Sequence, residues 1–223
     1  MTRLARRTVS SRRSVPLRLD HLARLPEEQR ACLFWEATPV SRARLDREEA
    51  IEEKEAWVST VLREWGSCGR VILVEDQPVA FALFAPPQWL PGAESLPTSP
   101  SSPDAVVLAT VWVAPEHRGG GLGRILVQGV ARDLVERGQV AIEAYGDTRG
   151  QRGCVAPADF WAAVGFKTQR PHVTTPRMRM ELRSALSWKD EVELAMEKVL
   201  SGLRPAKQKA ARPIGSARTA SQK

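Results

Sequence analysis

The stretch Val113-Ala-Pro-Glu-His-Arg-Gly-Gly-Gly-Leu-Gly-Arg124 joins a nearly all-apolar run, Ala105 to Val113, to a segment with apolar residues at helical spacing, Leu122 to Arg137. Its four glycines allow positive φ angles and a close approach of the backbone to a ligand. A helix that begins here directs amide groups and the positive end of its dipole toward one spot. Because Arg118 and Arg124 flank the turn, the sequence predicts a site for a phosphate or pyrophosphate group.

Two common phosphate-binding loops do not fit this turn. The dinucleotide pattern Gly-x-Gly-x-x-Gly fails because its last position falls on Arg124 when the pattern starts at Gly119, and on Leu126 when it starts at Gly121. The Walker pattern fails because no lysine lies near the turn. A different kind of phosphate loop is therefore indicated.

The turn resembles the coenzyme A pyrophosphate loop of the GNAT superfamily of acyl-CoA-dependent N-acetyltransferases, whose pattern Gln/Arg-x-x-Gly-x-Gly/Ala follows a strand ending in Val-x-Pro. Arg118, Gly121 and Gly123 fill this pattern after Val113-Ala-Pro115. A second element, Phe160-Trp161-Ala-Ala-Val-Gly165-Phe166, is similar to the family's Phe-Tyr-x-x-x-Gly-Phe. Two such elements in this order are more specific than either alone.

The resemblance, which covers about residues 70 to 182, implies an α/β (α+β) fold with acetyl-CoA as cosubstrate and no metal. A GNAT-like mixed central sheet is flanked by helices, and its fourth and fifth strands splay apart to admit the pantetheine arm. The resemblance further implies that main-chain amides of the glycine turn bind the pyrophosphate and that the end of the fourth strand pairs with the pantetheine. The expected cofactor-binding residues are Trp112, Val113, Arg118, Gly119, Gly120, Gly121, Leu122, Gly123 and Arg124.

Amine acetylation needs a group that accepts the amine's proton, a donor to the tetrahedral oxyanion and a proton for the departing thiolate. Many relatives use the Tyr of the Phe-Tyr element for the last role. This sequence has Trp161 there, whose indole is not an acid at working pH, so we expect it to pack in the core. Relatives often carry a basic Glu in the fourth strand, yet Val106 to Val113 contains no acid.

The segment of the fifth strand offers two replacements. Glu143 is the only carboxylate within Val140 to Ala144, and as a general base it would take the amine's proton directly or through one water; the alternative is a surface carboxylate. Tyr145, the only tyrosine of the chain, could protonate the thiolate, and its alternative is a buried phenol held by one hydrogen bond.

Glu36 and His172 are the candidates for binding the acceptor. Glu36 follows Cys32-Leu-Phe-Trp35, which is similar to a segment near the start of some bacterial members, or it is a charge on a helix surface. His172 lies in a turn that borders the acceptor site in this fold, or it is simply exposed there. We expect Cys154 to be a small buried residue and His117 to contact phosphate or solvent.

The spacing of apolar residues also predicts elements outside these motifs. A proline-rich loop, with six of the sixteen prolines, is expected over 86–104. Helices are predicted over 26–37, 46–65 with a stop at Gly66, 122–137, 158–164 and 188–200, and strands over 15–19, 71–75 and 79–85 as a hairpin, 105–113, 140–144, 166–167 and 178–182.

The composition, with 43% apolar and 26% charged residues among 223, excludes a wholly disordered chain and indicates a soluble globular protein. The net charge of +7 comes from two flanks, 1–14 and 204–223, which hold eleven Lys and Arg and no acid. Residues 15–203 contain the other 22 basic residues and 26 acidic ones, which gives this segment a formal charge of −4. We expect disordered basic tails over 1–14 and 204–223, an acetyltransferase domain over 15–186 and a C-terminal amphipathic helix over 187–203.

The three cysteines lie 36 and 86 positions apart, a spacing typical of neither a disulfide framework nor a zinc knuckle. We therefore expect a cytoplasmic protein without a targeting segment. Its longest apolar run ends at Ala114 and is far shorter than the roughly 20 residues that cross a bilayer. Neither a membrane nor a nucleic-acid partner is expected, and the chain should be a monomer or homodimer.

The sequence thus predicts an N-acetyltransferase that moves an acetyl group from acetyl-CoA to a primary amine by direct attack in a ternary complex. The acceptor is a small molecule or a protein lysine or N-terminus. A catalytically silent acyl-CoA-binding regulatory module is the alternative, because the family's Tyr and strand acid are absent. A nucleic-acid-associated protein would rest on the basic flanks alone.

Overall fold

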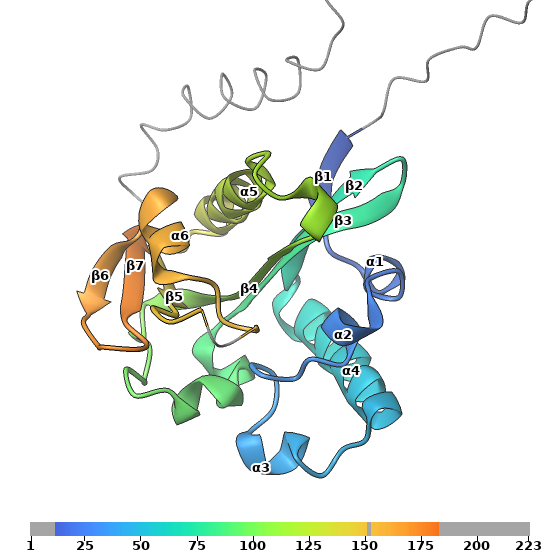
Figure 1. The fold of residues 1–223 in the computed structure, drawn as a ribbon, viewed down its shortest axis with the longest axis horizontal. Helices are drawn as coiled ribbons and strands as arrows, with labels where there is room; N and C mark the ends of the chain where they lie inside the picture. Colours follow the sequence, from blue (N-terminus) through green and yellow to red (C-terminus); the bar gives the residue numbers. More distant parts are fainter. Residues whose placement is uncertain (1–11, 151–152, 183–223) are drawn as a thin grey trace, which may run out of the picture.

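A computed structural model describes residues 12–150 and 153–182, which form a seven-stranded sheet with helices on both faces (Figure 1). No helix in these two ranges is long and apolar enough to cross a membrane. In chain order the elements are β1 (Arg12–Pro16), α1 (Leu19–Leu22), α2 (Glu27–Arg30), α3 (Pro39–Arg42), α4 (Arg47–Trp65), β2 (Gly69–Val74), β3 (Gln77–Ala85), η1 (Pro87–Trp89), η2 (Pro91–Ser95), β4 (Ala105–Val113), η3 (Pro115–His117), α5 (Leu122–Glu136), β5 (Ala141–Tyr145), α6 (Ala158–Ala163), β6 (Lys167–Arg170) and β7 (Arg177–Glu181).

The strand order β1-β2-β3-β4-β5-β7-β6 is antiparallel throughout except for the parallel pair β4 and β5. This mixed sheet confirms the predicted fold class. The β4–β5 pairing covers only Ala105–Val107 and Ala141–Glu143, and β4 continues to Val113. Beyond the paired stretch, β4 also bulges against β3 at Ala109, which has no partner in the register. A bulge bends its strand, and the predicted splay of the two strands stays a prediction.

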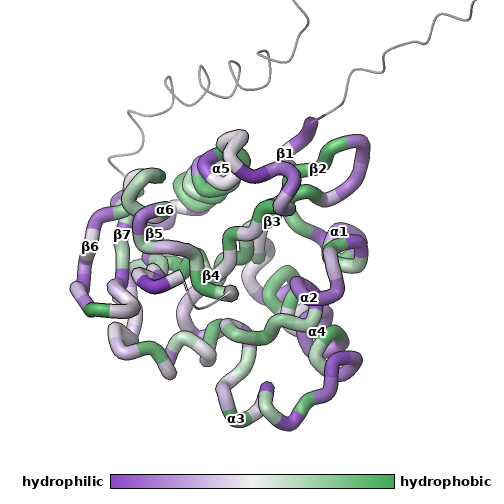
Figure 2. The backbone as a smooth tube through the Cα atoms, in the orientation of Figure 1, coloured by the Kyte–Doolittle hydropathy of each residue, from purple (hydrophilic) through white to green (hydrophobic). Residues whose placement is uncertain are grey.

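Two apolar clusters lie on the two faces of the sheet. Figure 2 colours the backbone by hydropathy and shows hydrophobic residues along β4 and α5. On one face α5 packs Leu126, Val130 and Leu134 against the strands, beside α6. On the other face α4 contributes Trp57 and Val61, together with residues of α1 and of the 86–104 loop. The helical spacing of apolar residues in α4 and α5 therefore reflects the sheet face that each helix covers.

The all-apolar sequence of β4 follows from its central place between these clusters. Val106 and Leu108 belong to the cluster under α5, whereas Val107 and Ala109 belong to the cluster under α4. A strand covered on both faces needs apolar residues at every position, which is why its bounds could be predicted correctly from the run alone.

Capping residues fix the ends of α4 where the sequence predicts them. The side chain of Asp46 accepts hydrogen bonds from the amides of Glu48 and Glu49 at the start of the helix. Gly66 ends it in the left-handed region with a φ of 82°. The predicted helix over 46–65 is thereby confirmed within one residue.

The hairpin of β2 and β3 is confirmed, but its turn lies earlier than predicted. Glu75 and Asp76 form the turn with φ angles of 51° and 64°. Pro78, expected in the turn, is the second residue of β3. Two consecutive residues with positive φ suit the twist of a tight hairpin, which the proline cannot provide.

Two predicted elements near the N-terminus need correction. The helix expected over 26–37 is reduced to α2, because Phe34 and Trp35 lie in a turn that is held by side-chain hydrogen bonds to distant segments. The strand expected over 15–19 is β1, so residues 12–14, assigned above to the basic tail, belong to the sheet. The remainder of both predicted tails and the predicted helix over 188–200 lie outside the described residues.

The 86–104 loop runs under the sheet from the α4 side to the β7 side (Figure 1). Near its start, the Trp57 indole donates a hydrogen bond to the carbonyl oxygen of Trp89 at 2.7 Å. Further along, the Thr98 hydroxyl donates to the carbonyl oxygen of Thr175, next to β7, at 2.9 Å. The loop is therefore attached to α4 on one side and to the segment before β7 on the other.

Candidate active site

A cavity of about 700 Å³ lies beside the end of β4. This volume is in the range of small-molecule and cofactor sites. Its wall combines the end of β4, the start of α5, the segment before α6, and residues of α2 and α4. The lining residues are Glu28, Gln29, Cys32, Lys54, Phe81, Thr110, Val111, Trp112, Val113, Arg118, Gly123, Gly150, Gly153, Cys154, Val155, Ala156, Pro157 and Phe160.

The glycine turn has the backbone geometry expected of an anion loop. Gly119 and Gly121 have φ angles of 76° and 80°, and a Cβ built on either would meet no atom within 4 Å. Glycine is thus required there by conformation and leaves the turn open to a ligand. Gly121 is the N-cap of α5, whose first amides have no partner within the helix. Leu122 buries its side chain in the core, so only its main chain faces the turn.

Gly123 connects the two motifs that carry the family resemblance. A Cβ at this position would lie 2.9 Å from the ring of Phe160, so only glycine allows α5 to approach α6 this closely. The Arg124 guanidinium donates a hydrogen bond to the carbonyl oxygen of Ala163 at 2.6 Å, at the end of α6. The phosphate loop is therefore positioned by direct packing on the second motif.

Arg118 joins the glycine loop to β4, and Trp112 joins β4 to β3. The Arg118 side chain donates a hydrogen bond from Nε to the carbonyl oxygen of Val113 at 3.0 Å. The Trp112 ring packs on Phe81 with the ring centroids 5.8 Å apart. Of the nine expected cofactor-binding residues, Trp112, Val113, Arg118 and Gly123 line the cavity. The exposed Gly119, Gly120 and Gly121 form the adjoining turn.

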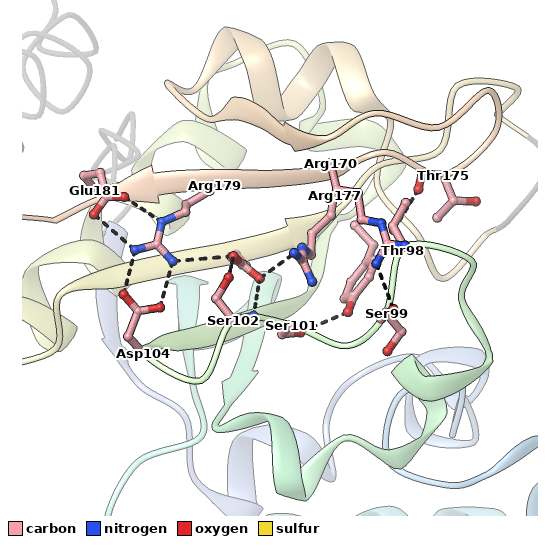
Figure 3. Close-up of polar contacts among 12 residues, drawn as sticks. Thr98, Ser99, Ser101, Ser102, Asp104, Arg170, Thr175, Arg177, Arg179 and Glu181 are labelled. Carbon is pink, nitrogen blue, oxygen red and sulfur yellow. Dashed lines mark hydrogen bonds and ion pairs between the residues drawn. The ribbon is translucent and has the colours of Figure 1, made fainter.

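Glu143 does not line the cavity and is fully buried. Its partners Ser102, Arg177 and Arg179 are labelled in Figure 3. Its two carboxylate oxygens accept hydrogen bonds from the Ser102 hydroxyl at 2.6 Å and the Ser102 amide at 3.0 Å. Arg177 and Arg179 add ion pairs at 3.3 and 3.5 Å. The burial of Glu143 excludes the alternative of a surface carboxylate, and in this structure both oxygens are directed at Ser102 and the two arginines. It faces the loop side of β5, where it anchors the 86–104 loop to β7.

Tyr145 is also outside the cavity wall, and its side chain is buried. Its hydroxyl shares one hydrogen bond with Ser101 at 2.9 Å, which matches the alternative of a buried phenol. Trp161 is fully buried, and its indole donates to the carbonyl oxygen of Tyr145 at 3.0 Å. The expectation that Trp161 packs in the core is confirmed.

The two candidates for acceptor binding have different environments. Glu36 is buried, and one of its oxygens accepts from the Lys54 ammonium at 2.5 Å. It lies behind the wall, which Lys54 itself reaches. His172 is exposed and does not line the cavity. Its Nδ1 accepts hydrogen bonds from the amides of Thr174 and Thr175 at 3.2 and 3.1 Å, so the ring closes the turn before β7.

Sequence reasoning missed a polar cluster on the cavity wall. The sulfur atoms of Cys32 and Cys154 lie 2.6 Å apart, and Lys54 donates to the carbonyl oxygen of Cys32 at 2.7 Å. The hydrogen bond from Cys154 and the charge of Lys54 lower the pKa of the Cys32 thiol to about 6, against the effect of burial. The same contact and burial raise the pKa of Cys154. Cys154, expected to be buried, is half-buried at the wall.

Glu28 was missed as well. This residue of α2 contributes the single carboxylate among the lining residues of the cavity. In the sequence it belongs to the acid-rich first turn of a helix, where acidic side chains are usually solvated. The pattern carries no sign that the first turn of α2 faces the end of β4.

Comparison with known proteins relates this architecture to acetyltransferases. Residues 27–153 match the acetyltransferase (GNAT) family. The aminoglycoside acetyltransferase AAC(6')-Ib in complex with coenzyme A is 16% identical with a TM-score of 0.53, covering 81% of this chain and 99% of that one. YncA from Salmonella typhimurium with its cofactor acetyl-CoA is 16% identical with a TM-score of 0.53, covering 77% and 94%.

The PaiA N-acetyltransferase from Thermoplasma acidophilum in complex with coenzyme A is 14% identical with a TM-score of 0.52, covering 77% of this chain and 99% of that one. At these identities the structural likeness concerns the fold. A search of curated proteins gives no match.

Proposed function

The chain belongs to the acetyltransferase (GNAT) family, and on that basis we propose that it transfers the acetyl group of acetyl-CoA to a primary amine of a small molecule, a protein lysine or a protein N-terminus. The observation that carries the proposal is the open, left-handed turn at Gly119 and Gly121, which begins α5 beside the cavity. Structurally similar proteins in complex with coenzyme A or acetyl-CoA support the donor. An aminoglycoside acetyltransferase among them supports an amine acceptor.

The glycine turn and the end of β4 supply complementary groups for acetyl-CoA. Main-chain amides over 118–124 and the dipole of α5 bind the pyrophosphate, and the guanidinium groups of Arg118 and Arg124 add positive charge. The main chain of β4 after Val107, which has no β5 partner in the described register, pairs with the pantetheine arm. The thioester is thereby directed to the cavity between Trp112 and the α2 wall.

Within this arrangement the amine attacks the thioester carbonyl carbon directly. A tetrahedral intermediate forms, its oxyanion accepts a hydrogen bond from a main-chain amide at the end of β4, and its collapse breaks the C–S bond and releases the coenzyme A thiolate. Glu28 accepts the proton of the amine, because it is the single carboxylate on the described cavity wall. The thiolate leaves as an anion or takes a proton from solvent.

Binding of the donor can be tested with a pair of glycine variants. Coenzyme A should raise the melting temperature of the chain, because a ligand that binds only the native state stabilises it. Gly121→Glu should abolish this rise by placing a carboxylate beside the phosphates. Gly138→Glu is the control, since Gly138 also has a positive φ of 73° and an open surround but lies beyond the other end of α5. A rise that persists in Gly121→Glu places the coenzyme elsewhere.

The chemical step can be tested on α2. Glu28→Gln should lower the maximal rate with an amine acceptor by roughly 10²-fold, the usual contribution of a positioned general base, and should leave the coenzyme-induced melting shift intact. Glu27→Gln removes a neighbouring exposed carboxylate that pairs with Arg47 at 3.0 Å, and its rate should stay within about threefold of the original. Equal losses in both variants contradict the assignment. Coenzyme binding without transfer to any amine favours the silent acyl-CoA-binding module.

A further inference from the structure

Cys32 and Cys154 are brought together on the cavity wall from positions 122 residues apart. Cys32 follows α2, and Cys154 belongs to the segment that precedes α6. Their sulfur atoms lie 2.6 Å apart, while a disulfide bond is about 2.05 Å long, so bond formation needs an approach of only about 0.5 Å. The pair is therefore arranged for covalent linkage with little movement of the chain.

Buried side chains hold the backbone at both cysteines. The Trp35 indole donates a hydrogen bond to the carbonyl oxygen of Cys154 at 2.9 Å, and the Lys54 ammonium donates to that of Cys32 at 2.7 Å. Trp35 is 1% exposed and Lys54 is 2% exposed. Two fixed donors from different parts of the chain thus hold the cysteines against each other, so the contact is a property of the packed fold.

The surroundings also divide the two thiols into a nucleophile and its partner. The hydrogen bond from Cys154 and the positive charge of Lys54 favour the Cys32 thiolate, whereas burial and the charge of Glu36 oppose it. Cys154 retains its proton, because the contact with Cys32 and burial raise its pKa. A reactive thiolate beside a protonated second thiol, both at a cavity open to small molecules, is the arrangement of a redox-sensitive pair.

Cys68 provides an internal comparison. It is fully buried, lines no part of this cavity, and burial raises its pKa to about 12. A thiol of this kind is inert toward mild oxidants. Selective oxidation of the other two cysteines is therefore expected in the folded chain.

We propose that Cys32 and Cys154 form a peroxide-sensitive modification site, at which hydrogen peroxide converts the two thiols into a disulfide. The Cys32 thiolate attacks one peroxide oxygen, the O–O bond breaks, and the departing hydroxide takes a proton to become water. The Cys154 sulfur then attacks the sulfenic sulfur of Cys32, the S–O bond breaks, and the second oxygen leaves as water with the proton of Cys154. Two thiols are oxidised and one peroxide is reduced to two waters.

The disulfide would join the segment after α2 to the segment before α6 across the cavity wall. Residues of both segments line the cavity beside the end of β4, so their linkage restricts the space in which an acceptor meets the thioester. This consequence rests on the proposed function, whereas formation of the bond does not. Acetyl transfer should fall at least about tenfold on oxidation and recover with dithiothreitol.

Peptide mapping of the full chain tests the bond itself. The chain is treated with hydrogen peroxide, blocked with N-ethylmaleimide, and digested with trypsin without reduction. Cleavage after Arg30, Arg42, Arg152 and Lys167 should give the peptides 31–42 and 153–167 joined and lighter than their sum by two hydrogen atoms, with dithiothreitol separating them. A peroxide-treated chain in which this linked peptide is absent, or is found only between two chains, overturns the proposal.

Single variants separate this proposal from the proposed function. Cys68→Ser should keep both the linked peptide and the loss of turnover, whereas Cys32→Ser and Cys154→Ser should lose both and keep the coenzyme-induced melting shift that shows an intact fold. If the chain with the Cys32–Cys154 disulfide keeps its turnover, the claim that this bond restricts the cavity is wrong. A reduced chain that forms the link but never transfers acetyl supports the redox site and contradicts the acetyltransferase proposal.

Discussion

Two buried carboxylates, Glu143 and Glu36, lie on the same side of the sheet and differ in how completely they are bonded. Glu143 has hydrogen bonds on both oxygens and two ion pairs, to Arg177 and Arg179. Glu36 pairs with Lys54 through one oxygen, and its other oxygen has no hydrogen-bond partner among the described residues. Glu143 is therefore fully hydrogen-bonded, and Glu36 is not.

This difference in hydrogen bonding corresponds to a difference in position relative to the cavity. A buried carboxylate that makes four polar contacts with three residues is already bonded on both oxygens, so we expect it to contribute to folding more than to proton transfer. The incompletely bonded Glu36 adjoins Lys54 and Cys32, which reach the cavity wall. The incompletely bonded carboxylate is thus the one whose neighbours reach the cavity, whereas the fully bonded Glu143 does not line it.

The largest effect on stability is expected at Glu143, the fully hydrogen-bonded carboxylate. Glu143→Ala leaves Arg177 and Arg179 without their buried partner, so the free energy of unfolding should fall by about 3–5 kcal/mol. Turnover per folded molecule should stay within about threefold, since Glu143 lies outside the cavity. Urea denaturation and initial rates below the melting temperature measure the two quantities. Glu181→Ala, which removes an exposed partner of Arg179, should cost about 1 kcal/mol or less.

A variant at Glu143 that folds as stably as the original chain but loses most of its turnover would reverse the comparison. It would return Glu143 to the role of general base, reached by a rearrangement of the 86–104 loop.

A smaller effect on stability is expected at Glu36, the incompletely hydrogen-bonded carboxylate, together with a change in the reactivity of Cys32. Glu36→Gln keeps a side-chain oxygen that accepts a hydrogen bond from Lys54 but leaves this buried ammonium without a counter-charge, so the free energy of unfolding should fall by about 3 kcal/mol. Because the Glu36 charge raises the pKa of Cys32, its removal should lower that pKa further. Alkylation of Cys32 by iodoacetamide at pH 5, where only a small fraction of the thiol is ionised, should then be faster by a few fold. Slower alkylation would contradict the assigned electrostatics.

Glu55→Gln is the matched control for this measurement. Glu55 is a half-exposed residue of α4 that pairs with Arg30 at 3.3 Å. Neutralising it should leave the alkylation rate of Cys32 unchanged.

The smallest effect on stability is expected at Asp104, an exposed partner of Arg179. Arg179 donates hydrogen bonds to both oxygens of Asp104, which lowers the pKa of that carboxyl. A folded-state pKa below the unfolded value means stabilisation that is present above about pH 4 and lost as the pH falls further. Asp104→Asn should therefore cost at most about 1 kcal/mol at pH 7, because the pair is exposed, and nothing at pH 2. Equal losses at both pH values in urea denaturation would contradict an ionic origin.

Local patterns were sufficient to predict the elements that carry the coenzyme loop. The apolar run of β4, the glycine turn and the spacing of α5 each depend on neighbouring residues, and the structure has all three where the sequence places them. Capping at Asp46 and Gly66 fixes α4 in the same way. The family resemblance is confirmed by the match of residues 27–153 to the acetyltransferase (GNAT) family, and its two motifs meet at Gly123 and Phe160.

The catalytic and acceptor candidates could not be predicted because their environments are built from distant residues. Glu143 was chosen as the single carboxylate of its strand, but Ser102 and Arg179, which fix it, are 41 and 36 positions away. The pairing of Cys32 with Cys154 spans 122 positions, which no periodicity reveals. Sequence patterns predict which face of an element is apolar, and they leave open which polar groups meet across the fold.

The 86–104 loop has a mechanical consequence for the open middle of the sheet. Hydrogen bonds between β4 and β5 end after Val107 in the described register, so beyond that point the two halves of the sheet share no ladder. The loop is held to Trp57 of α4 on one side and to Tyr145, Glu143 and Thr175 on the other. We expect this loop and the paired residues Ala105–Val107 and Ala141–Glu143 to resist separation of the two strands. Changes in the loop should then alter the rigidity of the cavity, although the loop contributes no residue to its lining.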